Sequence, residues 1–385
     1  MNSKFVKWQL KAWLVPLIIL GVYGLLAIVL PRLSENYIVS PDVPEYVMKK
    51  SIEGAVSGFS QMALSTAVIL SLILSVISSD YKWKRARYDA YAQLPLCNNG
   101  VKRHRMILSL AIVATMFTLH YWLGAGTFAL RWLSLKQAAA SSGGLVGGVD
   151  FMPILLSYLL GVVGLAAVHL TNFAIASMSH SLWSALMMLL LGNLVINLGP
   201  TLILGYFFPF FGRPSYDMFA YGSVTGVDVV YRLNDIFSKK AAFIEPKLSN
   251  EVLIALVVGG VVTLGLGVGS FFYVLFRKEM SGEYCGGKSF DTFGKTLFPH
   301  AFALVVAFAI GQIGAAAGKV ILASGMAVAI IEMVFILLGY FVLLFVYFLT
   351  LRIGKWQWII AGGIVALAVV LFLLGVIATP QAYVA

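Results

Sequence analysis

Residues 57–79 read SGFSQMALSTAVILSLILSVISS, a run without a single charged side chain. A helix rises about 1.5 Å per residue and the hydrocarbon core of a bilayer is about 30 Å thick, so roughly 20 mostly apolar residues span it. A surface helix of a soluble protein would instead carry a polar face. The run therefore predicts a transmembrane helix.

The composition of the whole chain agrees with this interpretation. Of 385 residues, 60% are hydrophobic and 11% are charged, and the mean hydropathy is +0.92, whereas soluble domains are about 25% charged. We therefore expect an all-α, polytopic transmembrane bundle of about nine spans. The stretches long and apolar enough are 13–31, 57–79, 107–130, 151–175, 182–208, 252–276, 298–317, 324–350 and 357–378.

The net charge of +11 falls on one side of this predicted membrane. With the N-terminus in the cytoplasm, the inner segments carry 16 Lys and Arg against five acids, and the outer segments carry 11 against ten. Cytoplasmic loops are the ones enriched in Lys and Arg, so we expect a cytoplasmic N-terminus and a multi-pass protein of the cell membrane. The inner segments are 1–12, 80–106, 176–181, 277–297 and 351–356.

The basic residues lie directly against the spans, and no nucleic-acid-binding module surrounds them. We therefore expect the lipid bilayer, and no nucleic acid, as their surroundings. Residues 80–106 form the longest inner segment. Within it Tyr81, Arg85 and Tyr88 fall at helical spacing, and Leu94-Pro95 ends the pattern. The pattern indicates a short amphipathic helix on the inner surface, or only an anchor that fixes the orientation.

An outer region follows the fifth apolar run. Asn197-Leu198-Gly199-Pro200 interrupts that run, since proline lacks a backbone donor and kinks or ends a helix. The aromatic stretch 201–212 is too short to span alone. It is a re-entrant or interfacial segment, or else the end of one long kinked helix.

The inner segment 80–106 contains Asp89-Ala-Tyr-Ala-Gln93-Leu94-Pro95-Leu96 and then a basic re-entry, Val101-Lys-Arg-His-Arg105. These two stretches resemble the loop between the second and third spans of permease subunits of ABC-2-type ABC transporters. The family form is Asp-x-x-x-Ser-Leu-Pro-Ile, so Gln93 replaces the usual Ser. Asn98-Asn99 also stands where a Ser-Arg pair is common.

Three further features are similar to this family, and the likeness covers about residues 1–290. Residues 1–11 resemble its basic N-terminal surface helix. The outer segment 200–251 lies between spans five and six, where the family has re-entrant helices. Glu283-Tyr-Cys-Gly286 resembles a Glu-x-x-Gly element of larger Gram-positive members.

The resemblance implies a fold and a role. We expect an ABC-2, type V exporter-like core of six spans in residues 1–297 and three additional spans in residues 298–385. The chain would be a transport subunit rather than an enzyme, exporting a hydrophobic or amphipathic compound such as a peptide antibiotic. The expected partners are two copies of an ABC ATPase, which would bind ATP-Mg, and a second copy of this permease or a related one. The residues implied in contact with the ATPase are Lys84, Arg85, Tyr88, Asp89, Gln93, Leu94, Pro95 and Glu283.

Residues 282–289 also match the phosphate-binding pattern G-x-x-x-x-G-K-[ST]. That loop must follow a strand and open a helix, whereas here it follows a predicted span in a segment too short for a nucleotide-binding domain. We therefore expect no catalytic, cofactor-binding or metal-binding residue in this chain, and ATP hydrolysis in another one.

Few polar groups lie inside the predicted spans. Glu332 is the one acid among 16 within a span, and burying a carboxylate in hydrocarbon is costly. It would contact a cationic cargo, relay protons, or hydrogen-bond within the bundle. His120 and His169 offer a further intramembrane polar site, although hydrogen bonds between helices are the favoured interpretation for both.

Two other functions remain open at this stage. A secondary transporter would need paired charges in broken helices and inverted repeats, and the sequence has one intramembrane acid and no clear repeat. An integral membrane enzyme would need acids or histidines gathered at one membrane face. Asp80 and Asp89 beside the basic loop are a sparse set for that purpose.

Overall fold

The structure is a computed structural model, and every element among the residues that it describes is helical. Those residues are 3–34, 45–83, 100–142, 147–179, 181–183, 185–190, 192, 193, 196, 226–246, 250–276, 300, 303, 304, 306, 307, 310, 311, 314, 325–351, 358–366, 369 and 370.

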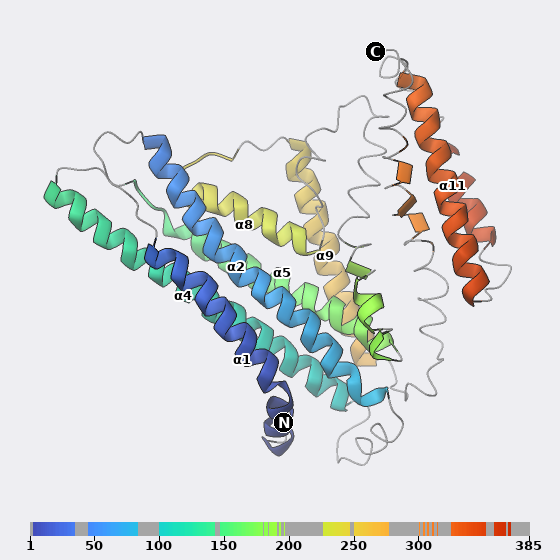
Figure 1. The fold of residues 1–385 in the computed structure, drawn as a ribbon, viewed down its shortest axis with the longest axis horizontal. Helices are drawn as coiled ribbons and strands as arrows, with labels where there is room; N and C mark the ends of the chain where they lie inside the picture. The colour runs from blue at the N-terminus through green and yellow to red at the C-terminus, as the bar shows by residue number, and fades with distance from the viewer. Residues whose placement is uncertain are drawn as a thin grey trace. The chain divides into compact units, whose positions relative to one another are not determined.

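The helices have the following bounds, and Figure 1 labels most of them. They are α1 (Ser3–Ser34), α2 (Glu45–Ser79), the 3₁₀ turn η1 (Asp80–Lys82), α4 (Gly100–Ser142), α5 (Phe151–Met178), α8 (Val227–Ala241), α9 (Asn250–Phe276) and α11 (Gly325–Leu351).

The all-helical prediction is confirmed for the described residues. Four of their helices are long and apolar enough to cross a membrane, namely Glu45–Ser79, Gly100–Ser141, Phe151–Met178 and Leu256–Phe276. Two shorter apolar helices, Trp13–Ile28 and Ile330–Phe345, lie within α1 and α11. Most of the predicted spans 182–208, 298–317 and 357–378 lies outside the described residues, so the number nine stays a prediction.

The chain forms two compact units. Unit 1 comprises residues 1–189 and 226–281, and unit 2 comprises residues 190–225 and 282–385. These are packing units. The functional division into a transport core at 1–297 and three added spans at 298–385 stays a prediction.

Helix α2 lies at the centre of unit 1, where it packs against α1, α4, α5 and α8 (Figure 1). Several of its buried positions are serines. Ser60, Ser75 and Ser79 each donate to the backbone carbonyl four residues earlier, at 2.6, 2.7 and 3.0 Å. A small hydroxyl satisfied within its own helix costs little to bury and lets neighbouring helices come close.

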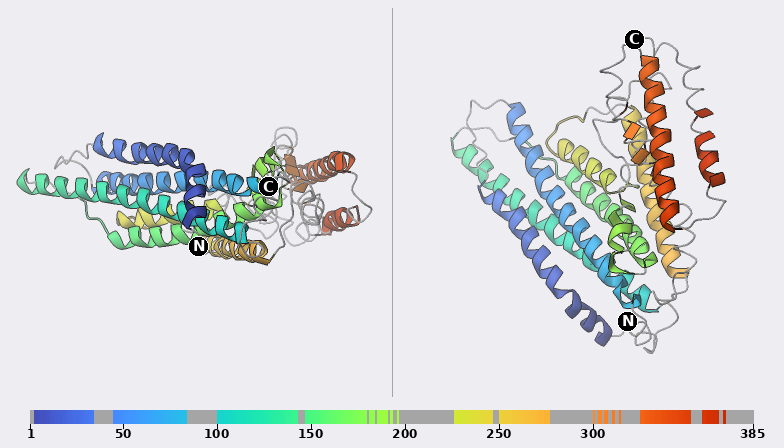
Figure 2. Two further views of the ribbon diagram at one scale, coloured as in Figure 1. Left: turned by 90° about the horizontal axis from the view of Figure 1, so that it is seen from below. Right: turned by 45° about the vertical axis from the view of Figure 1, so that its right-hand side comes forward.

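Aromatic rings fill the space between α2, α4 and α5. Phe59 meets Tyr121 edge to face with ring centroids 5.4 Å apart, and Phe117 stacks on Tyr158 at 6.0 Å. Glycines make room for the two phenylalanines, because a Cβ at Gly124 would lie 2.6 Å from Phe59 and one at Gly161 would lie 2.7 Å from Phe117. Figure 2 shows these helices side by side.

Helix α9 packs against α5 through small residues. A Cβ added at Gly267 would lie 2.6 Å from the Cα atom of Ala167, so the two backbones meet there. The opposite face of α9 is exposed and apolar, with Val261 65% and Val268 55% exposed. That pattern is typical of a helix with one face in a bundle and the other toward lipid.

Helix α8 lies in the predicted outer segment 200–251 and packs against α5 and α2. Its Asn234 is buried, donates to Ser60 at 2.7 Å and accepts from Ser157 at 2.6 Å. Val230 fits against Gly164, where a Cβ would lie 2.5 Å away. The aromatic stretch 201–212 lies outside the described residues, so its re-entrant character stays a prediction.

In unit 2, the described part of the packing centres on α11. Tyr340 is buried, and its hydroxyl lies 2.9 Å from Nδ1 of His300. Gly311 and Gly314 face α11, where an added Cβ would lie 2.3 Å from Ile336 and 2.7 Å from Phe335 respectively. Glu332 is half-buried on α11.

Candidate functional site

The residues predicted to contact an ATPase lie outside the described part of the chain. This holds for Lys84, Arg85, Tyr88, Asp89, Gln93, Leu94 and Pro95 in the first long inner segment and for Glu283 in the second. The helices from which these segments leave are described, however. Segment 80–106 leaves α2 through η1 and enters α4, and segment 277–297 follows α9.

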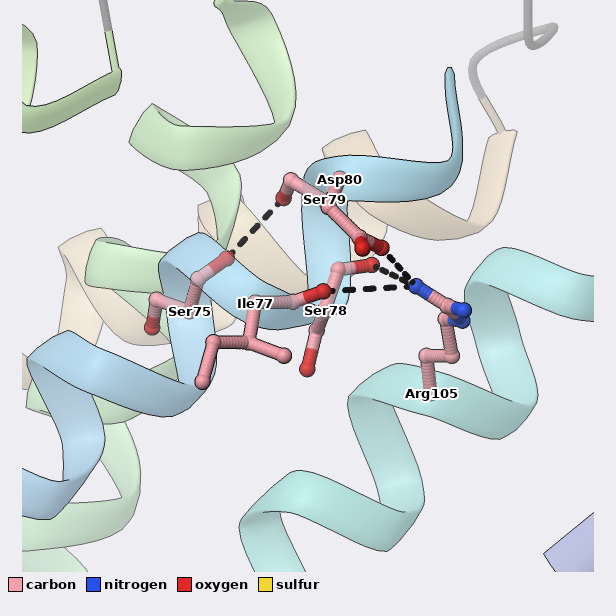
Figure 3. A network of polar contacts seen from close by, with 6 residues as sticks. All are labelled: Ser75, Ile77, Ser78, Ser79, Asp80 and Arg105. Carbon is pink, nitrogen blue, oxygen red and sulfur yellow. Dashed lines mark hydrogen bonds and ion pairs between the residues drawn. The ribbon is translucent and has the colours of Figure 1, made fainter. Parts of the chain in front are cut away.

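Arg105 joins the two ends of the first segment. It lies on the first turns of α4, and its side chain is 4% exposed. Its Nη1 atom lies 2.9 Å from Oδ1 of Asp80, 3.1 Å from the carbonyl oxygen of Ser78 and 3.4 Å from that of Ile77. Figure 3 shows the guanidinium of Arg105 reaching from α4 to the end of α2.

The position of Arg105 follows from the electrostatics of helix ends. The last four carbonyls of a helix have no partner within it, and the C-terminus carries a partial negative charge. Ile77 and Ser78 belong to the last turn of α2, and Asp80 adds a full negative charge beside them. A guanidinium presents several donors in one plane and can therefore bind these acceptors together.

Tyr81 completes this contact. Its side chain is 2% exposed, and the guanidinium carbon of Arg105 lies 4.5 Å from the centre of its ring. Such a cation–π contact adds about 1 kcal/mol or more when it is shielded from water. Tyr81 is the first residue of the spacing that predicts an amphipathic helix on the inner surface, and the structure places it inside the bundle against Arg105.

Arg103 joins the same end of α4 to α9. Its Nη2 atom donates to the carbonyl oxygen of Leu275 over 2.9 Å, in the last turn of α9. Beside this bond, Met106 of α4 packs in one buried cluster with Phe173 of α5 and Val274 of α9. The end of α4 is thus held to α9 by a hydrogen bond and by apolar packing.

We call Asp80, Tyr81, Arg103 and Arg105, with the carbonyl of Leu275, the arginine cluster. It brings together the C-terminal ends of α2 and α9 and the N-terminal end of α4. Both long inner segments of the predicted topology therefore start from this one cluster. Its hydrogen bonds and its ion pair hold the ends of three helices together.

A second polar group lies deeper in the bundle around His169. This side chain is fully buried on α5, and its Nδ1 and Nε2 atoms lie 3.0 Å from Ser71 on α2 and 2.9 Å from Ser109 on α4. Asn172 also donates to Ser71, over 3.3 Å. One ring nitrogen of a neutral imidazole donates and the other accepts, so the two serines complete its hydrogen bonds.

Replacing His169 by Phe should destabilise the protein by about 1–2 kcal/mol, because two buried hydrogen bonds between helices are lost while the ring volume is kept. Thermal unfolding of the detergent-solubilised protein measures this loss. Ser109→Ala should cost less, and the double variant should cost less than the sum, since both changes remove the same bond. Strictly additive costs would show that the bond contributes nothing.

His120 occupies a different contact, between α4 and α1. Its Nε2 atom lies 3.2 Å from the carbonyl oxygen of Gly21, and the ring lies where a Cβ of Gly24 would be. The interhelical hydrogen bonds predicted for His120 and His169 are confirmed. The two histidines share none of these partners, and Glu332 belongs to the other compact unit.

From the sequence, Arg103 and Arg105 are identified only as part of a basic re-entry into the membrane. Two features of the sequence also indicated an ion pair. Arg105 directly precedes a long apolar run, and Asp80 directly ends the preceding one. Opposite charges at two consecutive helix ends are placed to pair if the helices are antiparallel neighbours.

Among the described residues, no three His, Cys, Asp or Glu side chains lie close enough together to hold a metal ion. Comparisons of the chain with protein-family models, with curated proteins and with solved structures find no match.

Proposed function

We propose that this chain is the membrane-spanning subunit of an ATP-driven exporter similar to ABC-2-type permeases, located in the cell membrane. A separate ATPase binds and hydrolyses ATP-Mg and acts on segments 80–106 and 277–297. The chain itself carries no catalytic residue in this scheme.

The arginine cluster is the observation that supports this proposal. A partner that pushes on segment 80–106 acts on the end of α2 and the start of α4 together, because Arg105 on α4 donates to the carbonyl of Ser78 and to the carboxylate of Asp80. Without this link, the same push would separate the two helix ends. Arg105 therefore suits a loop that transmits force into the membrane.

The length of the helices supports the same mechanism. Helix α4 has 43 residues and α2 has 35, which correspond to about 64 Å and 52 Å at 1.5 Å per residue. Both exceed the hydrocarbon thickness of about 30 Å. Continuous helices of this length carry a displacement from the inner surface to the outer side.

The cargo and the second subunit are part of the proposal. A pathway between permeases needs two of them, so we propose a second copy of this chain or a related one. The apolar, aromatic spans suit a hydrophobic or amphipathic cargo such as a peptide antibiotic.

The test changes the stretch that resembles the family motif. Asp89→Ala with Pro95→Ala should abolish recovery of the ATPase with the tagged chain, or abolish transport, at unchanged expression. The reason is that Asp89 and Pro95 shape the segment that the ATPase would bind. Co-purification from native membranes and ATP-dependent efflux are the two measurements.

The chain offers a matched control in Pro41-Asp42, the same residue types in a predicted outer segment. The pair Pro41→Ala with Asp42→Ala should leave both measurements unchanged. If the Asp89 and Pro95 variant co-purifies and transports like the unchanged protein, the proposal is wrong.

A further inference from the structure

Two arginines on one turn of α4 bind two different helices. Arg105 binds the end of α2, and Arg103 binds the carbonyl of Leu275 at the end of α9. Residues two apart on an α-helix point about 200° apart around its axis. Helix α4 is therefore hydrogen-bonded to α2 on one side and to α9 on the other.

The hydrogen bond from Arg103 to Leu275 lies at the end of α9, next to the start of the second inner segment. Leu275 lies one residue before the end of α9, and segment 277–297 begins directly after Phe276. Its carbonyl is one of the last four of the helix, which have no partner within it. A donor from α4 thus fixes the point at which this segment leaves the membrane.

Buried apolar side chains pack beside the hydrogen bond between Arg103 and Leu275. Met106 is 1%, Phe173 1% and Val274 0% exposed, and all three belong to one buried cluster. Met106 follows Arg103 by one turn and Val274 directly precedes Leu275. The hydrogen bond therefore holds α4 and α9 at a packed contact.

We propose that Arg103 is a positioning residue that makes the C-terminal end of α9 move with the start of α4. A force on the start of α4 then reaches α2 through Arg105 and α9 through Arg103, so the ends of these two helices move together. This inference rests on the proposed function and adds to it a contact that couples α9 to α4. Arg103 acts through α9 and contacts neither ATP nor cargo.

The first experiment needs no ATPase. In a chain with Cys97 and Cys285 replaced by Ser, paired spin labels are attached through Leu130→Cys with either Phe276→Cys or Ile69→Cys. These three positions, on α4, α9 and α2, are 71%, 74% and 44% exposed. Pulsed electron paramagnetic resonance on the full chain in nanodiscs then gives the distance distributions.

Arg103→Gln should broaden the Leu130–Phe276 distribution about twofold and leave Leu130–Ile69 unchanged, since only the α4–α9 contact is loosened. Arg105→Gln is the matched control on the same helix and should broaden Leu130–Ile69 instead. Arg103→Lys keeps a donor for the Leu275 carbonyl and should restore a narrow distribution. An unchanged Leu130–Phe276 distribution in Arg103→Gln overturns the inference.

The second experiment uses the complex with its ATPase. In Arg103→Gln, ATP hydrolysis should continue while transport per ATP falls roughly tenfold, and Arg103→Lys should recover most of it. A merely structural role would lower hydrolysis and transport together with the yield of the complex. Coupled transport in Arg103→Gln overturns the inference and leaves the proposed function standing. Failure to recover any ATPase with the unchanged chain refutes the proposed function and this inference with it.

Discussion

Replacing Gly267 by Leu should detach α9 from α5 and destabilise the protein by about 3 kcal/mol. The new Cβ would lie 2.6 Å from the Cα atom and 3.2 Å from the carbonyl oxygen of Ala167, both of which are backbone atoms. A side chain can rotate away from an inserted group, but a helix backbone cannot, so the helices must separate. Thermal unfolding in detergent and the yield of monodisperse protein measure the effect.

Gly269→Leu is the matched control on the same helix. Nothing lies within 4 Å of a Cβ added at Gly269, so the stability should not fall, and it can rise by up to about 1 kcal/mol through helix propensity. Both variants gain the same helix propensity relative to glycine. Equal stabilities of the two variants would show that α9 does not meet α5 at Gly267.

Replacing Arg105 by Met should lower the stability by about 2 kcal/mol and loosen α2 from α4. Removing one partner of a buried ion pair leaves the other uncompensated. The cost stays at the low end because Asp80 is 36% exposed and can be hydrated. The two helix-end carbonyls also lose their donor, and the Tyr81 ring loses its cation. Thermal unfolding measures the first effect, and protease sensitivity of segment 80–106 measures the second.

Lys136→Met is the control for this change, since Lys136 is an exposed basic residue near the other end of α4. Its contact with the ring of Trp132, at 5.1 Å, is worth only about 0.5 kcal/mol at an exposed site. Loss of stability of the same size in both variants would mean that Arg105 stabilises nothing beyond its charge.

The helical class and the position of the longest helices followed from the apolar runs. Residues 57–79 and 151–175 lie inside α2 and α5, and 252–276 lies inside α9. The ends were less accurate. Hydropathy placed the third span at 107–130, but α4 continues to Ser142 because Leu133, Lys136 and the alanines at 138–140 favour a helix without being part of the apolar run.

The sequence predicts that the helices pack closely, but not which residues make the contacts. Glycines crowd the predicted span 252–276, and small residues favour close helix contact, yet Gly267 meets α5 while Gly265 and Gly269 face open space. Which of them makes contact depends on how α9 is rotated against its neighbour. This rotation cannot be predicted from the residues of α9 alone, because packing against the partner helix sets it.

The arginine cluster could be predicted in part. Positive charge near residues 102–105 followed from the topology, but its acceptors did not. Apart from Asp80, they are backbone carbonyls of Ile77, Ser78 and Leu275, and a carbonyl has no signature in the residue types. The same holds for His169, whose partners Ser71 and Ser109 are ordinary serines until three helices place them together.

We propose that a separate ATPase drives this chain through the segments that begin at the arginine cluster. The most direct measurement is affinity purification of the full-length tagged chain from its native membrane, followed by mass spectrometry and transport assays in liposomes. We expect an ATPase with Walker A, Walker B and signature motifs in the complex and transport that requires ATP. Transport by the purified chain alone, driven by a proton gradient without any ATPase, would contradict it.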